Sequence, residues 1–82
     1  MKTLNYSVVF KLETEGGYTA IVPSLPGCVT YGKTLEEAKK YTKEAIQSYL
    51  ASLKKHSEEI PTEENVLVGN INIDYKIQPS YL

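Results

Sequence analysis

The segment from Thr34 to Lys55 constrains the fold of this chain most strongly, because it carries a continuous helical pattern of apolar residues. Thr34 and Glu37 have the spacing of a capping box. In that motif the Thr34 hydroxyl accepts a hydrogen bond from the Glu37 N–H, and the Glu37 carboxylate accepts one from the Thr34 N–H. Apolar or small side chains then recur every three or four residues, which is typical of a helix with one buried face. We therefore predict one helix over about residues 34–55.

Much of the remaining chain alternates between apolar and polar residues, with the period of two that indicates half-buried strands. The predicted strands cover residues 4–12, 18–23, 29–31 and 66–77. Gly16 and Gly17 predict a hairpin turn after the first strand, because glycine tolerates the positive φ of tight turns. Pro26 and Gly27 fit the two central positions of a type II turn.

This order of elements predicts an α+β fold, β-β-β-α-β, with a mixed four-stranded sheet and one helix packed on one face. The helix would cross the sheet and place the last strand parallel to the first. A chain of 82 residues allows a single domain over residues 1–82, with a short tail at residues 78–82. The side chains expected to face the helix are Tyr6, Val8, Phe10, Tyr18, Ala20, Val22, Ile71 and Ile73.

The opposite face of the predicted sheet has no second helix to cover it, and an uncovered apolar face indicates an interaction surface. The residues that we predict to contact a partner are Val9, Ile21, Pro23, Leu25, Pro26, Gly27 and Cys28. A domain this small also has a thin core of its own. We therefore expect a homodimer or a higher homo-oligomer, formed through the uncovered face or through an edge strand.

Charge and composition exclude several classes of protein. Nine lysines, no arginine and ten acidic residues give a net charge of −1, which argues against a dedicated nucleic-acid-binding module. The N-terminus lacks the pattern of a signal peptide, and no segment approaches the roughly 20 apolar residues that span a bilayer. We therefore expect no membrane association and a cytoplasmic location.

The candidates for chemistry are few, so we predict no enzyme, no metal and no cofactor. Cys28 is the only cysteine and is best explained as a small buried residue. His56 stands at the helix end, where a favourable charge explains it more simply than catalysis. The alternative hypothesis is a remnant metal nuclease that uses Glu13, Glu36 and Asp74. The predicted strands, however, do not bring a set of carboxylates together.

Residues 24–50, SLPGCVTYGKTLEEAKKYTKEAIQSYL, closely resemble the N-terminal domain of HicB-type antitoxins. The resemblance covers about residues 4–55. The residues that carry it are Leu25-Pro26-Gly27-Cys28, Gly32, Thr34 and Glu37-Ala38. Gly32, Thr34 and Glu37 enter it as structural residues of the strand-to-helix corner.

The resemblance implies a truncated ribonuclease-H-like fold without the nuclease carboxylates. It also implies a protein that binds and neutralises a HicA toxin, a small ribonuclease that cleaves mRNA. Such antitoxins commonly form dimers or tetramers, and many carry a C-terminal DNA-binding domain. This chain ends at Leu82, so we expect no operator binding from it. The alternative is an orphan homo-oligomeric protein of the same family, with a regulatory or ligand-binding role and no toxin partner.

Overall fold

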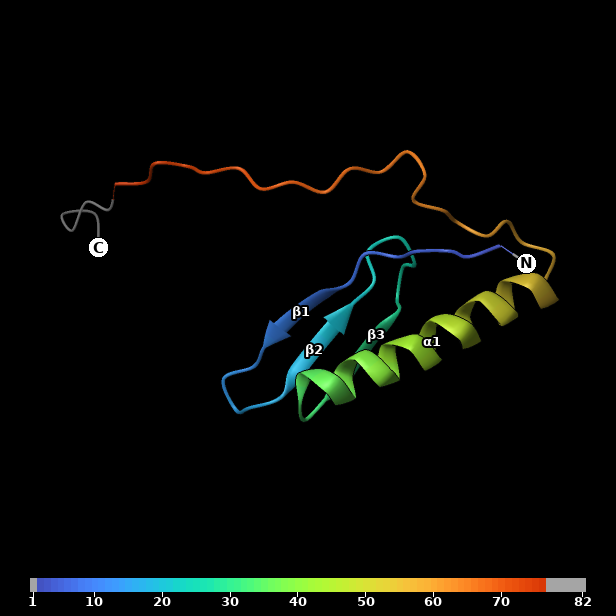
Figure 1. Cartoon of the computed structure of the whole chain (residues 1–82), viewed down its shortest axis with the longest axis horizontal. Helices are drawn as coiled ribbons and strands as arrows, with labels where there is room; N and C mark the ends of the chain where they lie inside the picture. The colour runs from blue at the N-terminus through green and yellow to red at the C-terminus, as the bar shows by residue number, and fades with distance from the viewer. Residues whose placement is uncertain (1, 77–82) are drawn as a thin grey trace.

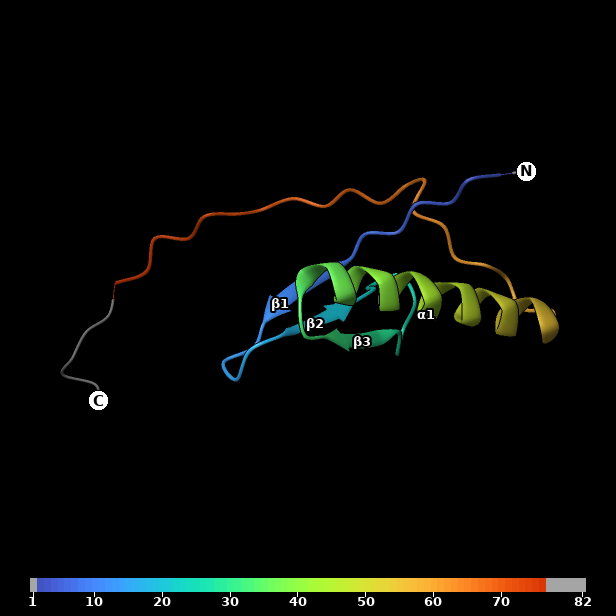
Figure 2. The ribbon, with the colours of Figure 1, turned by 60° about the horizontal axis from the view of Figure 1, so that its bottom comes forward.

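Three strands and one helix form the ordered part of a computed structural model that describes residues 2–76. The elements are β1 (Val9–Leu12), β2 (Tyr18–Ile21), β3 (Val29–Gly32) and α1 (Leu35–Lys55). The strands form one sheet in the order β1-β2-β3, and both neighbouring pairs are antiparallel. The helix covers one face of this sheet (Figure 1; Figure 2). The α+β class, the meander and the single covering helix are thus confirmed.

Both predicted glycine turns are present. Gly16 and Gly17 have φ values of 97° and 82°, and the Glu13 N–H donates to the Gly17 carbonyl at 3.0 Å across the turn between β1 and β2. Gly27 has a φ of 84°, and the Cys28 N–H donates to the Leu25 carbonyl at 2.9 Å. These features define the type II turn expected around Pro26 and Gly27.

The helix begins as the capping residues predict, with one change. The Thr34 hydroxyl accepts from the Glu37 N–H at 3.1 Å, whereas the Glu37 carboxylate accepts from the Lys33 N–H at 2.8 Å rather than from that of Thr34. Glu37 still satisfies a free backbone donor, one residue before the predicted one. At the other end, the His56 N–H donates to the Ser52 carbonyl and Lys54 lies in the last turn, so the helix ends where expected.

The core lies between the helix and the loop that joins β2 to β3. Its buried centre is Val22, Leu25 and Cys28. Partly buried side chains from the N-terminal segment and from the second half of α1 surround that centre: Tyr6, Val8, Ala45, Ile46, Tyr49 and Leu50. Ala20 and Ala38, which are also buried, complete the contact between sheet and helix. The predicted apolar stripe of the helix is therefore the face that packs.

A very close approach of backbones fixes the corner between β3 and α1. A Cβ atom built on Gly32 would collide with the Ala38 backbone nitrogen, and it would lie 2.6 Å from the Ala38 Cα and 2.8 Å from the Glu37 carbonyl carbon. Real Cβ atoms do not come so near to backbone atoms. Only glycine therefore fits at the point where the first turn of the helix crosses the strand.

The fourth strand of the predicted sheet is not formed, so the sheet has three strands among residues 2–76. Residues 66–76, which we call the C-terminal arm, run as an extended segment away from the sheet (Figure 1; Figure 2). Ile71 and Ile73 are 86% and 76% exposed and do not face the helix as expected. Residue 77 and the predicted tail at residues 78–82 lie outside the described residues.

The first strand is also shorter than predicted, because Val9–Leu12 pair with β2 and residues 4–8 do not. Strand assignment requires a hydrogen-bonded neighbour, and β2 ends at Ile21 before Pro23. Residues 4–8 and the C-terminal arm both alternate between apolar and polar residues, as strands do. Neither segment has a partner strand among the described residues of the single chain, and the ribonuclease-H-like description stays an expectation.

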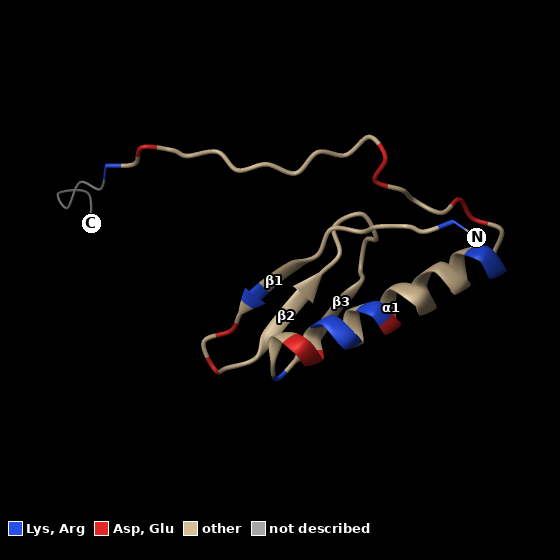
Figure 3. Cartoon of the chain, in the orientation of Figure 1, with Lys and Arg blue, Asp and Glu red and all other residues tan. Residues whose placement is uncertain are grey.

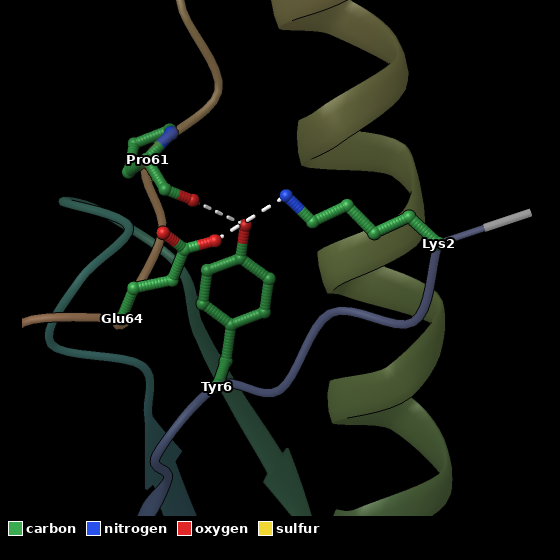
Figure 4. Close-up of polar contacts among 4 residues, drawn as sticks. All are labelled: Lys2, Tyr6, Pro61 and Glu64. Carbon is green, nitrogen blue, oxygen red and sulfur yellow. Dashed lines mark hydrogen bonds and ion pairs between the residues drawn. The ribbon is translucent and has the colours of Figure 1, made fainter.

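Polar contacts hold the segment after the helix against the N-terminal segment. The Tyr6 hydroxyl donates to the Pro61 carbonyl at 2.5 Å, and the Lys2 ammonium pairs with the Glu64 carboxylate at 3.3 Å (Figure 4). The Glu63 carboxylate accepts from the Ser7 N–H at 2.9 Å and from the Ser7 hydroxyl at 2.8 Å. We call residues 61–64 with their partners the clasp.

Ser24, at the start of the loop between β2 and β3, adds a further contact, because its hydroxyl donates to the Glu63 carboxylate at 2.8 Å. The hydrogen bonds from the Ser7 backbone and side chain lower the pKa of Glu63 below its usual range, with Ser24 contributing in the same direction. Burial raises the pKa of the Tyr6 hydroxyl, and the nearby charge of Glu63 adds to that rise. Glu63 thus links three parts of the chain as an ionised carboxylate.

We expect Gly32→Ala to lower the free energy of unfolding by about 1–3 kcal/mol, since a methyl group there must displace backbone atoms of the helix. Urea unfolding followed by circular dichroism measures this. Gly69→Ala is the matched control, because a Cβ at Gly69 meets nothing within 4 Å. Equal stability of the two variants would contradict the close approach.

The lowered pKa of Glu63 predicts a stability that depends on pH. The carboxylate favours the folded state above its ordinary pKa of 4.5, and this contribution is lost as the pH falls through the lowered pKa. In urea unfolding between about pH 5 and pH 3, wild type should lose more stability than Glu63→Gln. Glu64→Gln, which loses only the exposed contact with Lys2, should follow wild type. Parallel curves for wild type and Glu63→Gln would refute this role.

Candidate functional site

The face of the sheet that the helix does not cover carries a patch of exposed apolar side chains, which we call the open face. Val9, Ile21 and Val29 are paired across the three strands and form one row. They are 52%, 38% and 54% exposed, and Tyr31 on the same face is 51% exposed. Large apolar side chains gathered on one side of a sheet are typical of a surface that another molecule covers.

Tyr31 is held in position at the edge of the open face. Its hydroxyl donates to the Gly16 carbonyl at 3.0 Å, and its ring packs on Gly17, where a Cβ atom would require the ring to move. The β1–β2 turn is therefore a platform for this ring. An aromatic side chain that is fixed before binding loses little conformational entropy when a partner covers it.

The open face carries a charged side chain beside its apolar row, and the lysines of α1 belong to the other side of the sheet. Lysines line α1, and acidic residues lie in the β1–β2 turn and in the segment after the helix (Figure 3). Lys11 is the charged residue in the next row of that face, opposite Thr19, whose hydroxyl donates to Glu13 at 2.5 Å. The open face thus combines an apolar row with a neighbouring row that holds Lys11, Thr19 and Tyr31, and protein interfaces likewise combine apolar and polar area.

The structure divides the predicted partner-binding residues into two groups. Val9 and Ile21 lie side by side on the open face, and Pro23, Pro26 and Gly27 are exposed in the loop that follows β2. Leu25 and Cys28 are 0% and 5% exposed. Their side chains form the centre of the core, so a partner could reach only the surface of this loop.

Sequence reasoning missed Val29 and Tyr31 as members of the open face. The signal was present, since the two residues alternate with Thr30 and Gly32 along β3. Their membership became visible only with the pairing of Val29 opposite Ile21, because pairing decides which residues of a short strand share a face. Gly32, Thr34 and Glu37, in contrast, lie at the strand-to-helix corner.

A second apolar surface is a groove on the helix side of the sheet, between the N-terminal segment and α1. Its volume is about 520 Å³. Apolar side chains from both walls line its floor: Leu4, Tyr6, Val8, Phe10, Ile46 and Leu50. Lys2, Lys39 and Lys43 also line it. The groove lies beside the outer edge of β1, where the predicted fourth strand would have been.

The groups considered for catalysis are not arranged for it. Nδ1 of His56 lies 2.8 Å from the Ser52 carbonyl oxygen at the helix end, and burial raises the pKa of the Cys28 thiol. Within residues 2–76 no group of three or more His, Cys, Asp or Glu side chains could hold a metal ion. Glu13, Glu36 and Asp74 therefore form no metal site among these residues.

Comparison with known proteins identifies the family of this chain. A family model described as the HicB-like antitoxin of a bacterial toxin–antitoxin system matches residues 6–78. No helix within the described part of the chain is both long and apolar enough to cross a bilayer.

Several curated relatives are similar over most of the chain. A UPF0150 protein of Thermoplasma acidophilum is 48% identical over 60 residues, which is 73% of this chain and 87% of that protein. A UPF0150 protein of Synechocystis is 40% identical over 63 residues, covering 77% and 80% of the two chains. An uncharacterised 14.9 kDa protein of Haemophilus phage HP1 is 38% identical over 69 residues, which is 84% of this chain and 47% of that protein.

The burial of Cys28 predicts a slow thiol. We expect a thiol-specific reagent such as DTNB to modify the native protein at least about tenfold more slowly than the urea-unfolded protein, because the thiolate is disfavoured and shielded. A variant with a cysteine at an exposed position, Ser48→Cys in a Cys28→Ala background, is the control for a reactive thiol. Equally fast reaction of native Cys28 would show that the loop does not close over the core.

Proposed function

This chain belongs to the HicB-like antitoxin family of bacterial toxin–antitoxin systems, and we propose that it binds and neutralises a HicA-type toxin that cleaves mRNA. We assign this role to the single domain predicted over residues 1–82. The toxin would be its protein partner, and the cytoplasm, where mRNA is translated, would be the place of action. The chain would act by binding alone, without catalysis and without a cofactor.

The observation that carries the proposal is the row of Val9, Ile21 and Val29 on the open face. An antitoxin must present a surface that remains accessible in the folded chain and covers part of the toxin. This row provides such a surface on a rigid sheet, and Tyr31 adds a fixed aromatic anchor at its edge. The exposed loop residues Pro23, Pro26 and Gly27 extend the surface beyond the end of the strands.

Occlusion is the mode of action that best fits these residues. The thiol of Cys28 is buried, and the His56 ring is engaged at the end of the helix. Neither side chain has the partners that a catalytic group needs. A binding protein with an apolar face needs no such group, because covering the catalytic surface of a ribonuclease is enough to stop the cleavage of RNA.

The alternative function, an orphan homo-oligomer that regulates or binds a ligand without a toxin, has the groove as its supporting observation. A groove of about 520 Å³ is in the size range of small-ligand sites. The groove lies on the helix side of the sheet and the open face on the other. Variants of the two surfaces therefore distinguish the two functions.

Co-expression with a HicA-type toxin tests the proposal. Wild type should restore growth and elute in a complex with the toxin on size exclusion. In Val9→Asp/Ile21→Asp we expect the affinity to fall by about a hundredfold or more, because two carboxylates would be buried without partners. Isothermal titration of a catalytically inactive toxin measures that change.

Leu12→Asp is the matched control, since Leu12 is an exposed apolar residue of the same strand on its helix side, at 65% exposure. It should bind the toxin as wild type does. Circular dichroism of both variants checks that the fold is retained. Failure of wild type to bind any HicA-type toxin encoded beside its gene would favour the orphan alternative. Equal loss of binding in both variants would refute the open face as the interface.

A further inference from the structure

We propose that the groove between the N-terminal segment and α1 binds an amphipathic anion, a free fatty acid with one aliphatic chain and a carboxylate head. The aliphatic chain would lie on the apolar floor of the groove, and the carboxylate would lie between Lys39 and Lys43. The open face lies on the other side of the sheet, so this site is separate from the surface proposed for the toxin.

The floor of the groove is apolar, and its polar atoms are already hydrogen-bonded within the chain. The Thr42 hydroxyl donates to the Ala38 carbonyl at 2.6 Å, and the Tyr6 hydroxyl donates to the Pro61 carbonyl at 2.5 Å. The apolar side chains of the floor are only half-buried, so part of their surface still contacts water. A hydrocarbon chain suits such a floor, because it gains from burial and needs no hydrogen-bond partner.

Two lysines of the groove provide positive charge for an anion. Lys39 and Lys43 are exposed and lie four residues apart in the first half of α1, so they share one side of the helix (Figure 3). Lys2 pairs with Glu64 at 3.3 Å, whereas Lys39 and Lys43 form no ion pair among residues 2–76. None of the described residues that line the groove is Asp or Glu. An anion placed there meets two positive charges that no carboxylate compensates.

The charged part and the apolar part of the groove follow one another along its length. The helix runs back along the sheet from the end of β3, and the N-terminal segment begins near the C-terminal end of α1 (Figure 1; Figure 2). Lys39 and Lys43 therefore lie towards Phe10, whereas Leu50 lies towards Leu4. The helix wall from Lys39 to Leu50 is about 16 Å long. This length suits an extended aliphatic chain such as that of dodecanoate, with its carboxylate at the lysine end.

The chemistry of the groove favours a free fatty acid over other occupants. A phosphate head is commonly held by a helix N-terminus or by arginine, but Lys39 and Lys43 lie beyond the first turn of α1 and the chain has no arginine. A groove of about 520 Å³ with two walls suits a single small molecule. The C-terminal arm carries one acid, Asp74, and one base, Lys76, so it has no net negative charge to match the lysines.

Isothermal titration of the full chain with dodecanoate, below the concentration at which it forms micelles, gives the first test. Dodecanoate should bind, and decanoate should bind about tenfold more weakly because it buries two methylene groups fewer. Dodecyltrimethylammonium, which has the same chain and a positive head, should bind at least about tenfold more weakly than dodecanoate. No binding of dodecanoate, equal affinity for the two heads, or no dependence on chain length would overturn the proposal.

Lysine variants test the position of the carboxylate. Lys39→Gln/Lys43→Gln should weaken the binding of dodecanoate by about tenfold. Lys40→Gln/Lys55→Gln is the matched control, because it removes the same charge from two lysines of α1 that do not line the groove. It should bind as wild type does, and circular dichroism checks that both variants keep the helix. Equal affinity of the two variants would overturn the assignment of the two groove lysines.

Amide shifts of the ¹⁵N-labelled protein locate the bound molecule. Addition of dodecanoate should shift the signals of Val8, Phe10 and Ile46, which belong to the floor of the groove. The signals of Ile21 and Val29 on the open face should stay in place. Larger shifts at Ile21 and Val29 than at the floor would place the fatty acid on the open face and would overturn the proposal.

Two further results would assign the groove to another occupant and would overturn the proposal. One is a set of nuclear Overhauser contacts between Ile71 and the floor in the ligand-free protein, which would show that the arm fills the groove. The other is binding to vesicles of phosphatidylglycerol without binding of free dodecanoate, which would indicate a membrane surface. No toxin is present in any of these tests, so their failure would leave the proposed antitoxin role untouched.

Discussion

The contact between Gly32 and the first turn of α1 is the constraint on which most of the architecture depends. The strand and the helix meet backbone to backbone there, because no side chain separates them. Thr34 and Glu37 complete the corner by satisfying free backbone donors at the helix start. With the start of the helix fixed on β3, its apolar stripe can pack on one face of the sheet only.

That packing leaves the opposite face without a cover, and the composition of the face then becomes informative. A sheet that is solvated on one side normally shows polar residues there. Val9, Ile21 and Val29 depart from this expectation in one continuous row. The family to which the chain belongs implies a toxin as partner, and the row is the surface that we propose for its binding.

The clasp fixes the position of the segment after the helix, because it holds residues 61–64 against the N-terminal segment. Glu63 connects the N-terminal segment, the loop after β2 and the segment after α1 through one ionised carboxylate. After this anchor the arm extends away from the sheet (Figure 1). The open face and the groove are thus two apolar surfaces on opposite sides of one small sheet.

The sequence by itself determined the features that depend on near neighbours in the chain: the helix with its cap at Thr34, the turns at Gly16–Gly17 and Pro26–Gly27, and the alternation of the strands. It also indicated that Cys28 is a small buried residue. Only the tertiary structure decided that Leu25 belongs to the core rather than to an interface, and that Val29 and Tyr31 share a face with Val9. It also showed that residues 4–8 and the arm lack a partner strand within the described part of the chain. The reason is physical: a helix and a turn satisfy their own backbone hydrogen bonds, whereas a strand needs a neighbour whose position no local pattern specifies.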